Sequence, residues 1–143
     1  MQISVGDARE FLHEHIDPGA ENVELAGEGT WSRCFGYSSN GDDRVIRFGR
    51  QKADFLCDQK AASFDSQHLP VPKFFGIGEA FDGYYAITSR IFGTALEFCS
   101  PDEWNRTVTS AAAAIDAMRV LPTDEASSWG LWSDAHEYPT RRD

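Results

Sequence analysis

The sequence predicts an α+β fold built on a five-stranded, mainly antiparallel sheet. Several short segments alternate apolar and polar residues, tight-turn signals join neighbouring segments in pairs, and three longer segments have helical spacing. Strands that are joined by tight turns run antiparallel. A doubly wound dinucleotide-binding fold is therefore excluded, because its glycine loop would join a strand to a helix.

The predicted elements follow in the order helix, three strands, helix, two strands, helix. The first helix is expected over residues 4–17, where Ala8, Phe11 and Leu12 recur at helical spacing. Asn40-Gly41 and Asp82-Gly83 mark the two hairpin turns, since Asn and Gly tolerate positive φ. The strands are expected near residues 22–27, 33–38, 44–49, 73–81 and 84–89, with Val23 and Leu25 on a half-buried first strand.

Two further helices are predicted. Residues 52–66 have Phe55, Leu56 and Ala62 on an apolar side. The last helix, from about 101 to 119, begins with a capping serine at Ser100, a proline at the first helical position and a glutamate three residues after the serine.

Composition narrows the class of protein. The chain has 143 residues, enough for one domain with a real core, and a formal net charge of −10. That charge argues against a nucleic-acid partner, which would meet a basic face. No basic-plus-apolar leader and no stretch of 18 apolar residues are present, so no membrane association is expected. Three widely spaced cysteines favour a reducing, cytoplasmic location.

A glycine-rich turn carries the first functional signal. Gly27 and Gly29 lie between two predicted strands, where they would let backbone N–H groups approach a phosphate. A plain β-turn is the alternative. Arg47 follows in the third strand and Asp58 in the next helix, an order that fits the kinase plan of a phosphate loop, a cation and a helix carboxylate. The alternative for this pair is two solvated surface charges.

Four segments together resemble a known family. They are AGEGTWSRCFGY at 26–37, RVIRF at 44–48, LPVPKFFGIG at 69–78 and YYAITSRIFGTALE at 84–97. In order and spacing they are similar to the N-terminal kinase-like lobe of aminoglycoside phosphotransferases, in particular the hygromycin B kinase-like branch. The resemblance covers roughly residues 20–121. It implies an antibiotic-resistance kinase that transfers the γ-phosphate of ATP, with Mg²⁺, to a hydroxyl of a small cationic substrate such as an aminoglycoside.

The resemblance also implies roles for particular residues. Cys34 would lie above the adenine with Val45 beside it. Arg47 would replace the catalytic lysine and reach phosphate with its planar fork, held by Asp58. The phosphate loop would consist of Gly27, Glu28, Gly29, Thr30, Trp31 and Ser32, and the adenine edge would meet the backbone of Ser89, Arg90 and Ile91.

The family's catalytic motif, His-x-Asp-x-x-x-x-Asn, does not occur after Pro122. No catalytic residue or metal ligand is therefore assigned, and the chain is expected to be a truncated gene, a fragment or a split product. The expected parts are an N-terminal helix (1–19), an ATP-binding lobe with its hinge (20–93), a linking helix (94–122) and the start of a second lobe (123–143). Two hypotheses stay open: the ATP-binding part of a phosphotransferase, or a non-catalytic lobe that binds nucleotide weakly or docks on a partner. Apolar surface left uncovered would favour self-association.

Overall fold

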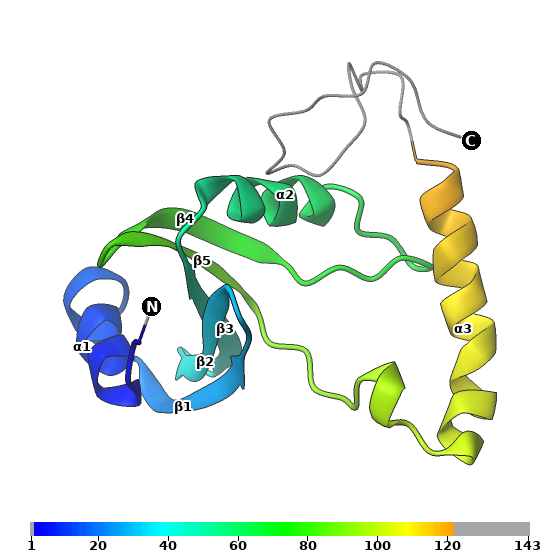
Figure 1. Ribbon diagram of the computed structural model, residues 1–143, viewed down its shortest axis with the longest axis horizontal. Coiled ribbons are helices and arrows are strands. Elements are labelled where there is room, and N and C mark those ends of the chain that lie inside the picture. The colour runs from blue at the N-terminus through cyan, green and yellow to red at the C-terminus, as the bar shows by residue number, and fades with distance from the viewer. Residues whose placement is uncertain (1, 122–143) are drawn as a thin grey trace. The chain divides into compact units, whose positions relative to one another are not determined.

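The computed structural model of the chain describes residues 2–121 and confirms the α+β fold with a five-stranded antiparallel sheet (Figure 1). The helices are α1 (Val5–His15), α2 (Lys52–Ala62), the short 3₁₀ helix η1 (Leu96–Phe98) and α3 (Pro101–Arg119). The strands are β1 (Glu21–Glu28), β2 (Ser32–Ser39), β3 (Asp42–Gly49), β4 (Phe74–Ala80) and β5 (Gly83–Ser89).

The chain divides into two compact units. The first consists of the residues up to 59 and residues 72–91, and it contains α1, the whole sheet and most of α2. The second contains residues 60–71 and, among the described residues, 92–121 with η1 and α3. The domain boundaries predicted from the sequence stay predictions, and the segment 123–143 lies outside the described residues.

The sheet has the strand order β1-β2-β3-β5-β4, and every neighbouring pair is antiparallel. Because side chains alternate between the two faces, β3 sends Ile46 and Phe48 to one face and Val45 and Arg47 to the other. The first face is the core face. Four large side chains of the sheet are buried there together with Leu12 of α1: Phe35, Tyr37, Ile46 and Phe48.

Helix α1 is held by a cap at its N-terminus and by an aromatic contact with the sheet. Ser4 and Asp7 form a capping box, in which each side chain accepts from the other residue's backbone N–H. The ring of Phe11 then meets Phe48 edge-on, with 5.5 Å between ring centroids. The cap and this aromatic contact fix the helix on the core face of the sheet.

The two hairpin turns differ. Asn40 and Gly41 take φ values of 52° and 86°, as the sequence predicts. The second turn was predicted at Asp82-Gly83, but β4 ends at Ala80, β5 begins at Gly83, and Phe81 takes the positive φ of 53°. An aromatic residue rarely adopts this conformation, so the sequence pattern placed the turn one residue too late.

Other expectations need correction. Leu25, expected with Val23 on the buried side of a half-buried strand, is 47% exposed, whereas Val23 is buried. The β1–β2 register shifts between Leu25 and Gly27. The helix predicted over residues 52–66 ends at Ala62, where the N–H groups of Ser63 and the next two residues bond to carbonyls three residues back and tighten the last turn. Leu56, expected on the apolar side of α2, is exposed.

In the second unit, α3 confirms its predicted start. Ser100 and Glu103 form a capping box, and Pro101 is at the first turn. The apolar side chains of α3 are largely exposed, among them Trp104, Val108, Ile115 and Met118. Self-association through such a surface stays a prediction.

A buried hydroxyl gives a pH-dependent prediction. Ser39, 1% exposed, donates from its Oγ to Asp17, and this bond, with the N–H of Gly19, lowers the pKa of Asp17. A lowered pKa stabilises the fold above the ordinary Asp value of about 3.9 and loses that effect as pH falls through the folded value. The variant Ser39→Ala should therefore reduce the free energy of unfolding at pH 7, and the difference should narrow below about pH 4. Urea unfolding at several pH values measures this, and a difference that is constant with pH would contradict it.

Candidate functional site

The register of four strands brings the glycine turn and Arg47 into one row. Gly27 lies opposite Cys34, Cys34 opposite Arg47, and Arg47 opposite Ala86. Residues directly opposite each other share a face of the sheet. The predicted phosphate turn and the predicted cation therefore lie on one face, the face that α1 does not cover.

Arg47 and Asp58 form the ion pair that the sequence predicts. The guanidinium Nη2 donates to Asp58 Oδ2, and the two side chains are 31% and 38% exposed. The guanidinium carbon also lies 4.8 Å from the ring centroid of Phe55, the one fully buried side chain of α2. Helix α2 thus holds Arg47 from two sides.

The pKa of Asp58 is raised, although an aspartate beside an arginine usually has a lowered pKa. Burial raises the pKa of Asp58, and nearby Arg47 only partly opposes this effect. A raised folded pKa means that the ionised carboxylate costs stability at neutral pH. Such perturbed groups concentrate at functional sites, although structural ion pairs produce them too.

The turn itself offers hydrogen-bond donors. Gly29 N–H donates to Ser32 O at 2.9 Å and closes the turn. Within the described chain, the N–H groups of Thr30 and Trp31 have no acceptor. A Cβ on Gly27 would have no atom within 4 Å, so the approach to the backbone is open there. These donors fit an anion such as phosphate.

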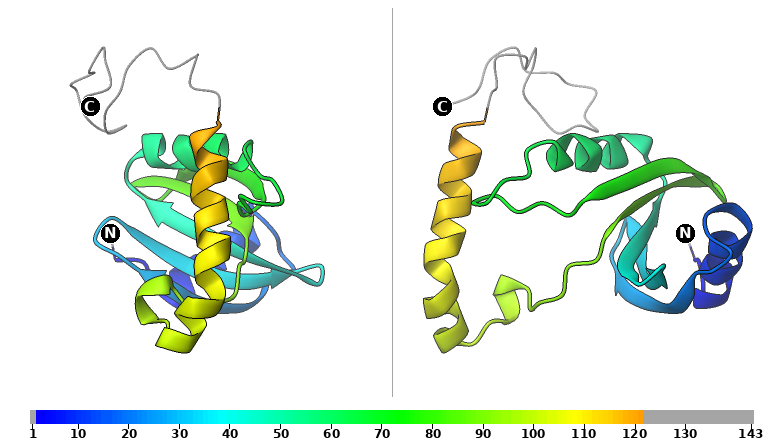
Figure 2. Two further views of the ribbon diagram at one scale, coloured as in Figure 1. Left: turned by 90° about the vertical axis from the view of Figure 1, so that its right-hand side faces the viewer. Right: turned by 180° about the vertical axis from the view of Figure 1, so that it is seen from behind.

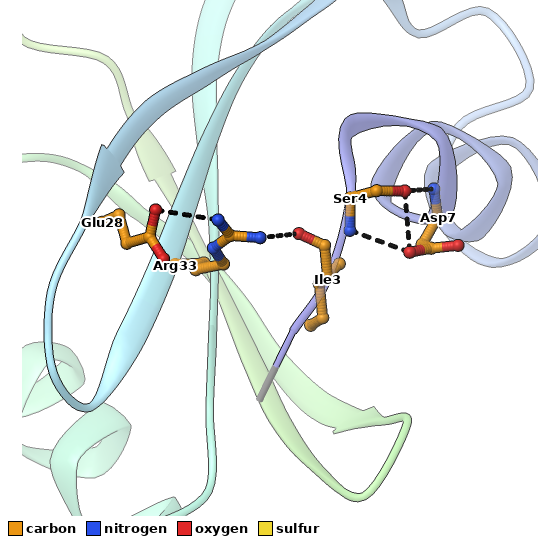
Figure 3. A network of polar contacts seen from close by, with 5 residues as sticks. All are labelled: Ile3, Ser4, Asp7, Glu28 and Arg33. Atoms are coloured by element: carbon orange, nitrogen blue, oxygen red, sulfur yellow. Dashed lines mark hydrogen bonds and ion pairs between the residues drawn. The ribbon is translucent and has the colours of Figure 1, made fainter.

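The one acidic residue of the turn is held by an arginine. Glu28 Oε2 accepts from Arg33 Nη2 at 2.8 Å, and Arg33 Nη1 donates to the carbonyl of Ile3, just before the α1 cap (Figure 3). This hydrogen bond lowers the pKa of Glu28. Because Arg33 lies opposite Phe48 in the ladder, it is on the core face. The N-terminal segment therefore supports the glycine turn from behind. This support was not predicted.

An apolar surface continues the same face. Cys34 and Val45 lie one row apart on β2 and β3. Burial raises the pKa of the Cys34 thiol, and Arg47 opposes this only in part. The thiol is therefore neutral at physiological pH, and the two side chains offer an uncharged contact surface.

The segment after β5 has fewer open donors than predicted. Ser89 N–H donates to Lys73 O at 2.8 Å, and Arg90 N–H donates to Asp43 O at 3.0 Å. The N–H of Ile91 has no acceptor among residues 2–121. Of these three N–H groups, only that of Ile91 is open to a ligand.

The side chain of Arg90 also forms a long-range contact. Its Nη1 donates to Glu24 Oε1 at 2.8 Å, and a Cβ built on Gly36 would lie only 2.3 Å from that nitrogen. Gly36 is therefore needed to seat the guanidinium. The contact joins the end of β5 to β1 and β2. No local pattern predicts it, because 66 residues separate Arg90 from Glu24.

A catalytic-loop pattern does occur elsewhere in the chain, from His15 through Asp17 to Asn22. Its aspartate is bonded to Ser39 and Gly19 at the turn after α1. Asp17 therefore stabilises a turn and is not placed as a base beside Arg47. The described residues contain no group of three or more His, Cys, Asp or Glu side chains that could hold a metal. Between residues 2 and 121, no helix is long and apolar enough to cross a membrane.

Comparison with known proteins supports the fold. No family model matches the chain, and neither does any curated protein. Solved structures do match. The crystal structure of aminoglycoside phosphotransferase APH(4)-Ia shares 26% identity at a TM-score of 0.78, over 85% of this chain and 42% of that one. Thermostable mutants in ternary complexes with hygromycin B and either AMP-PNP or ADP share 25% identity at a TM-score of 0.74.

The chain is thus similar to the N-terminal, kinase-like lobe of aminoglycoside phosphotransferases. It spans about two fifths of the length of these structures. The fold resemblance inferred from the sequence is confirmed. The roles of the individual residues stay predictions.

The support of the turn can be tested with Arg33→Met, which removes both donated hydrogen bonds. Backbone amides at 29–32 should exchange with solvent several-fold faster, because local openings become easier, while the urea midpoint barely changes. Hydrogen exchange followed by mass spectrometry measures this. Arg119→Met, at an exposed pair in α3, is the matched control. Unchanged exchange at the turn would show that Arg33 does not support it.

Proposed function

We propose that this chain is the ATP-binding part of an aminoglycoside-type phosphotransferase. The observation that carries the proposal is that Arg47, which is paired with Asp58 of α2, lies in one row with Gly27 of the glycine turn. Kinases use this combination to bind and orient phosphates. The similarity to structures of a phosphotransferase that contain AMP-PNP or ADP adds support.

The phosphates would lie between the turn and Arg47. The free N–H groups of Thr30 and Trp31 would donate to phosphate oxygens, and Arg47 would add a charge-assisted, two-pronged contact. Asp58 would keep the guanidinium of Arg47 oriented toward the phosphate site when no nucleotide is bound. Glu28 is compatible with this role, because Arg33 neutralises its carboxylate.

The adenine would lie against the apolar surface of Cys34 and Val45. Its edge would accept a hydrogen bond from Ile91 N–H. Arg90 would position the backbone at Ile91, since its side chain holds the segment after β5 against Glu24 and Gly36. Of the three residues expected to contact the adenine edge through their backbone, Ser89, Arg90 and Ile91, only Ile91 would donate its N–H.

Mg²⁺ would arrive with the nucleotide and neutralise charge on the transferred phosphate. The acceptor would be a hydroxyl of a small cationic substrate such as an aminoglycoside. No residue of the described chain is assigned as base or metal ligand. A second candidate function is therefore a nucleotide-binding lobe without transfer activity, favoured by the structural role of Asp17.

The first prediction concerns Arg47→Met. The dissociation constant for Mg·ATP should rise about tenfold or more, because a charge-assisted contact to phosphate is lost, while adenosine binding stays unchanged. Isothermal titration calorimetry measures both ligands. Arg50→Met, whose side chain is exposed in a loose pair with Asp82, is the matched control. Equal loss of ATP and adenosine binding would indicate a damaged fold rather than a lost phosphate contact.

The second prediction separates stability from function at Asp58. Since its pKa is raised, the ionised carboxylate costs stability at pH 7, and the variant Asp58→Asn should be at least as stable as the parent chain. The same variant should bind Mg·ATP about two- to fivefold more weakly, because Arg47 loses its charged partner. Urea unfolding and calorimetry test the two halves. A less stable variant with unchanged affinity would assign the pair to structure alone.

The third prediction is that the 143-residue chain alone does not phosphorylate an aminoglycoside. Phosphoryl transfer depends on positioned metal ions and a nucleophile-orienting residue, and neither is assigned in the described chain. Mass spectrometry of an aminoglycoside panel incubated with the chain and Mg·ATP would detect product. Turnover above background would contradict the prediction and place catalytic residues within these 143.

A further inference from the structure

A pocket lies in the first unit, between α1 and the β4–β5 hairpin. Its volume is about 500 Å³, within the range of small-molecule pockets. The views agree that α1 lies beside the turn of this hairpin (Figures 1 and 2). Because α1 packs on the core face, the pocket is not part of the Arg47 face. Nothing in the proposed nucleotide site uses it.

The charge of this pocket is uncompensated. Four carboxylates line it, and no lysine or arginine does: Asp7, Glu10, Glu14 and Glu79. Asp7 is occupied by the α1 cap, and Glu14 lies 3.7 Å from His15. The carboxylates of Glu10 and Glu79 have no hydrogen bond or ion pair within the described chain. The pocket therefore favours a cationic occupant.

The walls of the pocket are aromatic. Three rings line it, and the ring centroid of Phe11 lies 5.5 Å from that of Phe81 and 5.3 Å from that of Tyr85. Phe81 is 54% exposed, at the tip of the hairpin. Aromatic faces attract ammonium groups and also cover the methylene chains between them. Rings and carboxylates together select an organic cation rather than a hydrated metal ion.

The spacing of the carboxylates points the same way. They are distributed around the pocket, and the described residues hold no group of acidic side chains close enough to coordinate a metal. Asp7, Glu10 and Glu14 follow one side of α1 at helical spacing, while Glu79 approaches from β4. Separated anions around apolar walls suit a ligand whose positive charges are also separated by apolar links.

From these features we infer that this pocket binds a small aliphatic polyamine. Its ammonium groups would pair with Glu10 and Glu79, and its methylene chain would lie across Phe11, Phe81 and Tyr85. The inference does not depend on the proposed nucleotide function. It concerns the other face of the sheet and uses none of the residues assigned to phosphate or adenine.

Spermidine is the probe, titrated into the ¹⁵N-labelled chain at low ionic strength. Amide shifts should saturate in α1 and around residues 79–85, and the affinity should fall as salt is added. Magnesium at matched ionic strength should not reproduce the shifts. If saturable shifts are missing at millimolar spermidine, if they lie elsewhere, or if magnesium causes the same ones, the inference is wrong.

Two variants test the rings and the charges separately. Asn tolerates the positive φ at position 81, so Phe81→Asn keeps the turn while it removes one ring, and the dissociation constant should rise about threefold or more. Glu10→Gln combined with Glu79→Gln should raise it about fivefold or more. Glu97→Gln, outside the pocket, should leave it unchanged. Equal affinity for all variants would mean adventitious binding and would overturn the inference.

Discussion

The pairing register of β1, β2, β3 and β5 is the constraint on which the candidate site depends. It places Gly27, Cys34, Arg47 and Ala86 in one row, so the turn, the apolar surface and the cation share a face. A slip of one residue in β3 would send Arg47 into the core and Phe48 toward the ligand. The buried rings of Phe35 and Phe48 oppose that slip, since they have no other face on which to pack.

The two faces of the sheet differ in character: one is the buried core face, and the other carries the residues of the candidate site. The core face carries the buried aromatic side chains and receives α1. The opposite face carries the partly exposed Arg47–Asp58 ion pair, in which the pKa of the carboxylate is raised. The glycine turn adds N–H donors that have no acceptor in the described chain. Arg33 links the two, because it is on the core face and holds Glu28 in the turn. The position of the glycine turn thus depends on a residue of the core face. A loop, which is usually more mobile than the elements it connects, can in this way be held in one conformation before a ligand binds.

Much of this arrangement could be predicted from local signals. The Asn40-Gly41 turn, the Ser100 cap and the Arg47–Asp58 pair all follow from residue types at short or family-defined spacing. What failed depended on conformations or contacts without a local signal. Phe81 adopts a positive φ that its type disfavours, and Leu25 is exposed on a strand whose register shifts on both sides of it. The partners Arg33 and Ile3, like Arg90 and Glu24, are 30 and 66 residues apart, and only the folded sheet brings them together.

The exposed face of the sheet is proposed to bind the phosphates and the base of ATP. An NMR titration of the ¹⁵N-labelled chain with Mg·AMP-PNP tests it most directly, because the open donors are specific amides. We expect saturable shifts at Thr30 and Trp31 from the phosphates and at Ile91 from the base, and adenosine should shift only Ile91. Shifts confined to other regions of the chain, or none at millimolar nucleotide, would contradict it.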